Sequence, residues 1–200
     1  MIIIPELDTV VITPPRTAST SLHKAVKAHY PSAFSLYRHM EANGVPPGYD
    51  LWRKIGVVRE PLERLWSLYK YIHKGESNYR QQIEKTKGNF ELPEFNKWVI
   101  NENIPLVTGF DYRERNLPTY MPYYSCLVTL PETRKSQYYY LRPDLGTEII
   151  RFDQLNKLED ALFLSIPRAN GTDNNEPPEI SKEVEEHLKT FFSWDLKQFI

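Results

Sequence analysis

The sequence predicts an α/β fold with a mostly parallel central sheet flanked by helices. Short β-branched runs alternate with amphipathic segments along the chain, which is the pattern of strands joined by helical crossovers. The 200 residues are 40% hydrophobic and 26% charged, a composition typical of a globular protein with its own core. We therefore expect a single domain over residues 1–200.

The first half of the chain is predicted to run strand, loop, helix, and then to repeat this order. Thr9–Thr13 (TVVIT) is a β-branched run that two prolines end, and a helical pattern of apolar residues begins at Ser19. Ser32–Tyr37 is compatible with a further short strand. Lys54–Val58 (KIGVV) predicts the next strand, and Pro61 opens a helix at the position where a missing N–H costs nothing.

The rest of the chain contains three predicted helices and one predicted strand. Leu92–Glu102 is predicted as a helix, Thr147–Phe152 as a late strand, and Gln154–Leu164 as the helix that follows it. A last helix is expected from Ser181 onward. The aromatic, proline-broken region 108–143 carries no clear periodicity and stays unassigned.

Charge and cysteine usage exclude several classes of protein. A formal net charge of -1 excludes a globally basic nucleic-acid binder. Cys126 is the single cysteine, which excludes an internal disulfide framework and a cysteine-based zinc site, and we expect no metal. The sequence shows neither a membrane-spanning apolar run nor a signal-peptide pattern, so we expect a cytoplasmic protein without a membrane partner.

The segment Thr13–Ser21 (TPPRTASTS) joins a predicted strand to a predicted helix. A loop in this position presents backbone N–H groups at a helix N-terminus, where an anion is favoured. One guanidinium and four hydroxyls add to this preference for an oxyanion, from Arg16, Thr17, Ser19, Thr20 and Ser21. The loop lacks the glycines and the lysine of a Walker A motif. The alternative is that its serines and threonines merely cap the helix.

The segment Arg59–Tyr69 (REPLERLWSLY) follows the KIGVV strand. Arg59 stands at the carboxyl end of that strand, where α/β sheets present ligand-binding groups. Arg64, Ser67 and Tyr71 have helical spacing beside the apolar stripe, so they are predicted to form an anion-binding face together with Arg59. The alternative is an ordinary amphipathic helix with solvated arginines.

Both segments together, in this order, resemble the sulfotransferase family that uses 3′-phosphoadenosine 5′-phosphosulfate (PAPS). The resemblance rests on PPRTAST followed by R-x-P-x-x-R-x-x-S-x-Y. It implies a P-loop NTPase-like sulfotransferase fold, a PAPS donor and the product 3′-phosphoadenosine 5′-phosphate (PAP). It also implies that the first segment binds the 5′-phosphosulfate, through Pro15, Arg16, Thr17, Ala18, Ser19, Thr20 and Ser21. Arg59 and Ser67 take the 3′-phosphate by the same resemblance.

The first segment departs from the family pattern at two positions. Arg16 stands where lysine is commoner, and it offers a forked rather than a point charge. Ala18 stands where glycine is usual, which costs about 1 kcal/mol if the backbone φ there must be positive.

His39 is the candidate general base, because a neutral imidazole has a suitable pKa and the family often has a histidine between the two segments. Glu41 is the rival base. Arg16 is expected to stabilise the leaving phosphate and the transferring group. The expected acceptor is a hydroxyl or amine, most simply of a carbohydrate. The tyrosine-rich Gln137–Tyr140 either lines the acceptor cleft or forms a core strand, and His187 is expected to lie in solvent on an amphipathic helix.

Two alternatives to a sulfotransferase remain. One is a non-catalytic nucleotide-binding module that keeps the fold without turnover. The other is a degenerate P-loop kinase, which leaves the complete second segment unexplained and lacks the Walker A lysine followed by serine or threonine that holds phosphate and Mg²⁺.

Overall fold

The structure is a computed structural model of the chain and describes residues 1–36, 39–74, 78–88, 90–104, 130–167 and 176–200. Chain contacts divide these residues into two compact units. The sheet unit holds residues 1–36, 39–59 and 137–167, and the helical unit holds the others. Cys126 and the greater part of the unassigned region lie outside the described residues. A single domain stays a prediction.

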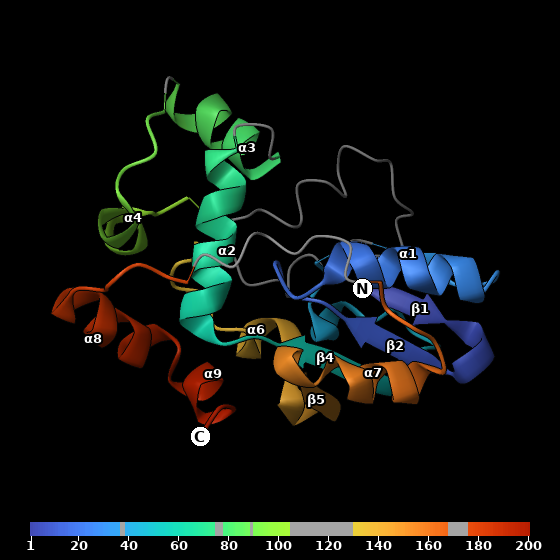
Figure 1. Ribbon diagram of the computed structural model, residues 1–200. Helices are drawn as coiled ribbons and strands as arrows, with labels where there is room; N and C mark the ends of the chain where they lie inside the picture. The colour runs from blue at the N-terminus through green and yellow to red at the C-terminus, as the bar shows by residue number, and fades with distance from the viewer. Residues whose placement is uncertain (37–38, 75–77, 89, 105–129, 168–175) are drawn as a thin grey trace. The chain divides into compact units, whose positions relative to one another are not determined.

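The sheet unit is an α/β assembly around a mixed sheet (Figure 1). Its strand order within the described residues is β3-β1-β2-β4-β5. The strands are β1 (Ile2–Ile4), β2 (Thr9–Ile12), β3 (Phe34–Ser35), β4 (Arg53–Val58) and β5 (Thr147–Arg151). β2 pairs with β4 and β4 with β5 in parallel, whereas β1 pairs with both β2 and β3 antiparallel. The α/β class is therefore confirmed, but the prediction of a mostly parallel sheet is wrong.

The antiparallel half of the sheet follows from the short connection between its first two strands. β1 ends at Ile4 and β2 begins at Thr9, with a single 3-10 turn (Pro5–Leu7) between them. Parallel neighbours need a crossover of about a dozen residues or more, so this connection can only make a hairpin. The predicted strands do not include Ile2–Ile4, so the predicted sheet lacks the antiparallel pairs that β1 makes.

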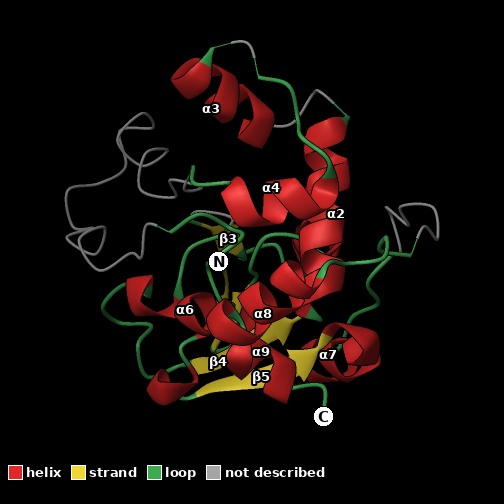
Figure 2. Ribbon diagram, turned by 90° about the vertical axis from the view of Figure 1, so that its left-hand side faces the viewer, coloured by secondary structure: helices red, strands yellow, loops and turns green. Residues whose placement is uncertain are grey.

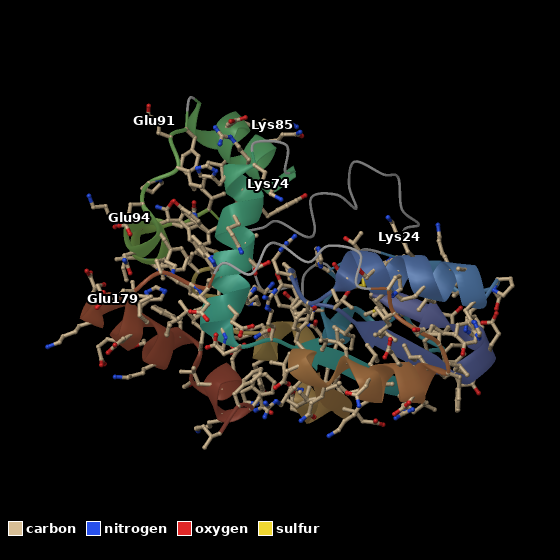
Figure 3. The ribbon with its side chains drawn as sticks, in the orientation of Figure 1. Lys24, Lys74, Lys85, Glu91, Glu94 and Glu179 are labelled. Carbon is tan, nitrogen blue, oxygen red and sulfur yellow. The ribbon has the colours of Figure 1, made fainter. Side chains whose placement is uncertain are left out.

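Two helices cover the same face of the sheet, α1 (Ser19–His29) and α7 (Leu155–Leu162). One buried cluster joins their apolar residues to alternate strand residues, among them Val11, Leu22, Val26, Ile55, Val57, Leu158 and Leu162. The hydroxyl of Tyr30 donates a hydrogen bond of 2.5 Å to the carbonyl of Leu162. The exposed Lys24 lies on the side of α1 that points away from the sheet (Figure 3).

The opposite face of the sheet carries the short helix α6 (Tyr138–Leu141). Ile55 and Val57 point toward α1 and α7, so the residue between them faces the other side, because side chains alternate along a strand. That residue is Gly56, and a Cβ atom built on it would lie 2.4 Å from Cδ2 of Leu141. Helix α6 therefore packs closely over β4 because Gly56 has no side chain. Gln137–Tyr140 is not a strand, which corrects one of the two readings of that segment.

The helical unit contains α2 (Pro61–His73), α3 (Asn78–Lys87), α4 (Phe95–Asn101), α8 (Lys182–Phe191) and α9 (Ser193–Lys197) (Figure 2). Its buried cluster includes Leu65, Leu68, Ile72, Trp98, Val99, Val184 and Leu188. Side chains cap three of these helices. Glu60 accepts the N–H of Glu63 on α2, Glu94 (labelled in Figure 3) caps α4, and Ser181 caps α8. The predicted helix starts at Pro61 and after Ser181 are confirmed, whereas α3 was not predicted.

The contact between Gly56 and Leu141 gives a stability prediction. Gly56→Ala should lower the free energy of unfolding by about 1–3 kcal/mol, because the added methyl group overpacks a closed site. Urea denaturation measures the loss. The control is the double variant with Leu141→Ala, which removes the nearest neighbour of the methyl and leaves only Cγ2 of Thr147, at 3.1 Å, in tight contact. The cost of the double variant should be smaller than the sum of the two single costs, and strict additivity would contradict the contact.

Candidate functional site

The candidate site lies in the sheet unit, where two parallel strands end at the same edge. β2 and β4 are paired with Ile12 opposite Gly56. The chain leaves β2 through Thr13 into the first segment, and it leaves β4 through Val58 and Arg59 into the second. Parallel strands have their carboxyl ends at one edge, and ligands in α/β sheets bind beyond that edge.

The loop after β2 has an unusual backbone. Pro14 accepts a hydrogen bond of 2.7 Å from the hydroxyl of Thr17, which closes the turn. Arg16 has a φ of 70° and Ala18 a φ of 60°, with Thr17 between them in the ordinary negative range. Alternation of this kind directs successive N–H groups to one side and forms an anion-binding concavity. Ala18 therefore occupies the left-handed conformation that the sequence analysis identified as costly for alanine.

The start of α1 argues against the capping interpretation of this loop. Its N-cap residue is Ala18, and an alanine has no side-chain oxygen to accept the first N–H groups of a helix. An anion placed at this N-terminus would supply that acceptor. Pro15, Thr17, Ser19 and Ser21 are buried, whereas Arg16, Ala18 and Thr20 are half-buried.

Arg59 reaches the loop from the end of β4. Its Nη1 donates to the carbonyl oxygen of Arg16 at 3.3 Å, and its guanidinium carbon lies 4.6 Å from the centre of the Phe152 ring. The Arg59 backbone also exchanges two hydrogen bonds with the side-chain amide of Gln137. The structure thus brings the first residue of the second segment against the first segment.

His39 also lies against the loop. Its Nδ1 is 2.9 Å from the carbonyl oxygen of Thr13, and since a carbonyl only accepts, Nδ1 carries the hydrogen of this bond. A neutral ring in this tautomer accepts a proton at Nε2. His39 is half-buried, whereas the rival base Glu41 is 0% exposed. A base must reach the proton that it removes, so the burial of the two residues favours His39.

Arg64 does not take part in an anion site, which corrects the expected anion-binding face of the second segment. It is 0% exposed and belongs to the helical unit. Its Nη1 lies 2.7 Å from Oε2 of Glu132, and its Nη2 donates to the carbonyls of Glu132 and Lys135 at 3.2 and 3.0 Å. A carboxylate 68 residues away therefore neutralises Arg64 inside the core.

Two other predicted residues lie in the helical unit. Ser67 is on α2 and 2% exposed, and its contact with a 3′-phosphate stays a prediction. His187 was expected in solvent, and this is wrong, because it is 8% exposed and its Nε2 lies 2.5 Å from the carbonyl oxygen of Thr133. Burial lowers the pKa of His187, since the charged ring is poorly solvated there.

Sequence reasoning missed two residues that hold Arg59. Phe152 is the last residue of a predicted strand. An aromatic residue at a strand end is a weak but usable signal that its ring packs against an arginine at the end of the neighbouring strand. Gln137 had no local signal, because its partner is 78 residues away along the chain. Its sequence context is only the tyrosine-rich segment that it begins.

The described part of the chain contains neither a metal-ligand cluster nor a membrane-spanning helix. Its His, Cys, Asp and Glu side chains form no group of three that could hold an ion. Its helices lack the combined length and apolar character that crossing a bilayer requires.

The strained backbone at Ala18 gives a second prediction. Ala18→Gly should raise the free energy of unfolding by about 0.5–1 kcal/mol, because glycine adopts a positive φ without a Cβ penalty. The matched control is Ala28→Gly, an exposed position near the end of the same helix, which should lose up to about 1 kcal/mol. Urea denaturation of both variants measures the two changes, and equal signs would contradict the assigned conformation.

The buried ion pair gives a third prediction. Arg64→Met should lower the free energy of unfolding by about 3–5 kcal/mol, because Glu132 is left buried without its partner. Replacing both residues, as Arg64→Met with Glu132→Leu, should recover most of that loss. Arg80→Met is the control, since it breaks the partly exposed pair with Glu84 and should cost less than about 1 kcal/mol. Equal losses in Arg64→Met and Arg80→Met would show that Arg64 is not buried with a carboxylate.

Comparison with known proteins gives one structural likeness. The structure is similar to the crystal structure of a sulfotransferase from Alicyclobacillus acidocaldarius, with 12% identical residues and a TM-score of 0.41. The alignment covers 96% of this chain and 93% of the other. No family model and no curated protein matches the sequence. At this identity and TM-score the likeness assigns neither a family nor an activity to the chain.

Proposed function

We propose that the protein is a PAPS-dependent sulfotransferase. One observation carries the proposal, the convergence of three predicted groups at the carboxyl ends of β2 and β4. These are the loop 15–21, the guanidinium of Arg59 bonded to the Arg16 carbonyl, and the imidazole of His39 bonded to the Thr13 carbonyl. An anion cradle, a separate arginine and a base within one small region are what sulfuryl transfer requires of a protein.

The loop 15–21 is proposed to bind the 5′-phosphosulfate of the donor. Left-handed backbone at Arg16 and Ala18 and the alanine N-cap of α1 support this role, because both provide N–H groups for an anion. Bound there, PAPS would supply an activated sulfuryl group. Arg16 is proposed to stabilise the negative charge that collects on the leaving phosphate.

Arg59 is proposed to bind the 3′-phosphate, with Ser67 as its partner from the second segment. A guanidinium binds phosphate through paired N–H donors, and the ring of Phe152 supports one face of this guanidinium. A separate 3′-phosphate contact distinguishes PAPS and PAP from nucleotides that lack this group.

His39 is proposed as the general base. Its Nδ1–H bond to the carbonyl of Thr13 fixes the ring beside the loop. Nε2 is therefore the atom that takes the proton from the hydroxyl or amine of the sulfuryl acceptor. The new bond then forms between the acceptor oxygen or nitrogen and sulfur. The bond from sulfur to the phosphate oxygen breaks, and its electron pair stays on that oxygen. The acceptor is proposed, from the sequence resemblance, to be a hydroxyl or amine of a carbohydrate.

Binding of PAP tests the donor site. PAP at about 100 times its Kd should raise the Tm by about 5–10 °C, and ATP with Mg²⁺ should not match this rise. Arg59→Ala should weaken PAP binding by about 10- to 100-fold, because it removes hydrogen bonds from a charged donor. Arg53→Ala is the matched control, since Arg53 lies at the other end of β4 in an exposed pair with Glu148. Stabilisation by Mg-ATP alone would reject the proposal in favour of a kinase.

Turnover tests the enzyme against the non-catalytic module. Transfer of labelled sulfate from PAPS to a panel of glycans should occur with the wild-type protein. His39→Ala should keep PAP affinity within about twofold and lower kcat by about 10²- to 10⁴-fold. His29→Ala, an exposed histidine on α1, is the control and should keep the wild-type rate. Normal turnover in His39→Ala would remove His39 from the mechanism, and PAP binding without any transfer would favour the module.

A further inference from the structure

The backbone of Arg59 is held by a side chain instead of by a neighbouring strand. The N–H of Arg59 donates to Oε1 of Gln137 at 2.9 Å, and Nε2 of Gln137 donates to the carbonyl of Arg59 at 2.7 Å. One primary amide therefore satisfies both polar groups of one peptide residue, as a partner residue in a β-ladder would do. Gln137 is 0% exposed, so water does not compete for these bonds.

The sheet explains why a side chain is needed at this position. The last pair between β4 and β5 joins Val58 to Arg151, so Arg59 lies one residue beyond the ladder. The next residue of the other strand, Phe152, already begins a 3-10 helix (Phe152–Gln154). No strand continues beside Arg59 among the described residues, and unpaired buried backbone groups are costly. Gln137 supplies the missing partner.

The backbone of Gln137 is fixed at the start of α6. Its main-chain carbonyl accepts the N–H groups of Tyr140 and Leu141 at 3.0 and 2.9 Å, and Gln137 is the N-cap residue of that helix. Leu141 packs over Gly56, two residues before the end of β4. The contact between Leu141 and Gly56 thus fixes α6 on β4, and Gln137 holds the residue that follows β4.

The held backbone sets the direction of the Arg59 side chain. With its N–H and carbonyl both engaged, the Arg59 backbone cannot rotate without losing a hydrogen bond. Its guanidinium lies over the Phe152 ring and against the Arg16 carbonyl. Rotation of the Arg59 backbone would move a charged group at the end of a long side chain by several ångströms. Precise placement matters for a bidentate contact with phosphate.

We propose that Gln137 is the positioning residue for Arg59 and thereby sets the preference of the site for a nucleotide with a 3′-phosphate. This inference rests on the proposed function, because it assumes that Arg59 meets that phosphate. Gln137 is 0% exposed, so it has no surface for a nucleotide to contact. It acts through the peptide groups of Arg59.

The experiment compares two nucleotides in a set of variants. Isothermal titration calorimetry measures the affinities for PAP and for adenosine 5′-phosphate, which lacks the 3′-phosphate. Gln137→Met keeps the length of the side chain and removes both hydrogen bonds. It should reduce the preference for PAP by about tenfold, as the loss of a partner that orients a ligand-binding residue typically does, and leave the affinity for adenosine 5′-phosphate unchanged. Gln81→Met, the same change at an exposed position of α3, should alter neither affinity.

A double variant separates positioning from general damage. In the Arg59→Ala background, Gln137→Met should have no further effect on the PAP preference, because the group that it positions is gone. Equal weakening of both nucleotides by Gln137→Met would overturn the inference, since misfolding has that signature. An unchanged PAP preference would overturn it as well.

Amide hydrogen exchange at Arg59 separates failure of this inference from failure of the proposed function. Gln137→Met should accelerate exchange of the Arg59 N–H by at least about tenfold, because its acceptor is lost. If the wild-type protein binds PAP and the exchange rate does not change, the hydrogen-bond arrangement is wrong and the proposed function stands. If exchange accelerates but the wild-type protein shows no preference for PAP, the proposed function and the role of Gln137 in it are both rejected.

Discussion

Parallel hydrogen bonding between β2 and β4, with Ile12 opposite Gly56, brings chain segments 43 residues apart to one edge of the sheet. Everything at the candidate site starts from this edge. The loop from Thr13 departs there, His39 bonds to the first carbonyl of that loop, and Arg59 reaches across from the neighbouring strand. Two antiparallel strands would have sent these segments to opposite ends of the sheet. The direction of one strand pair therefore decides whether the loop and Arg59 can meet at one edge.

Local sequence signals were sufficient to predict the strands and the helix that build this edge. They failed to predict the environment of a side chain whose partner is distant in the sequence. The β-branched runs of β2 and β4 and the proline at the start of α2 act within a few residues, so the sequence predicted them. Whether Arg64 is buried or exposed depends on a carboxylate 68 residues away. An arginine beside an apolar stripe looks the same in sequence whether it meets solvent or a buried partner.

The loop shows how the chain obtains a glycine-like backbone without glycine. Arg16 and Ala18 hold a positive φ, which costs of order 1 kcal/mol at each residue. The hydroxyl of Thr17 bonds to Pro14 and closes the turn between the prolines and the helix, and Arg59 bonds to the carbonyl of Arg16. Strained conformations persist where surrounding bonds over-determine them, and such positions concentrate at functional sites.

The long sequence separation between Arg59 and Gln137 affects the order in which parts of the site form during synthesis of the chain. A ribosome that adds about 5–20 residues per second delivers Gln137, 78 residues after Arg59, roughly 4–16 s later. During that interval the nascent chain already contains β1, β2, α1 and β4, but Arg59 has no amide to hold it. Contacts between distant residues are also slow to form, because a long loop must close first. The nascent chain thus contains the residues of its sheet edge before it contains the amide that orients the guanidinium.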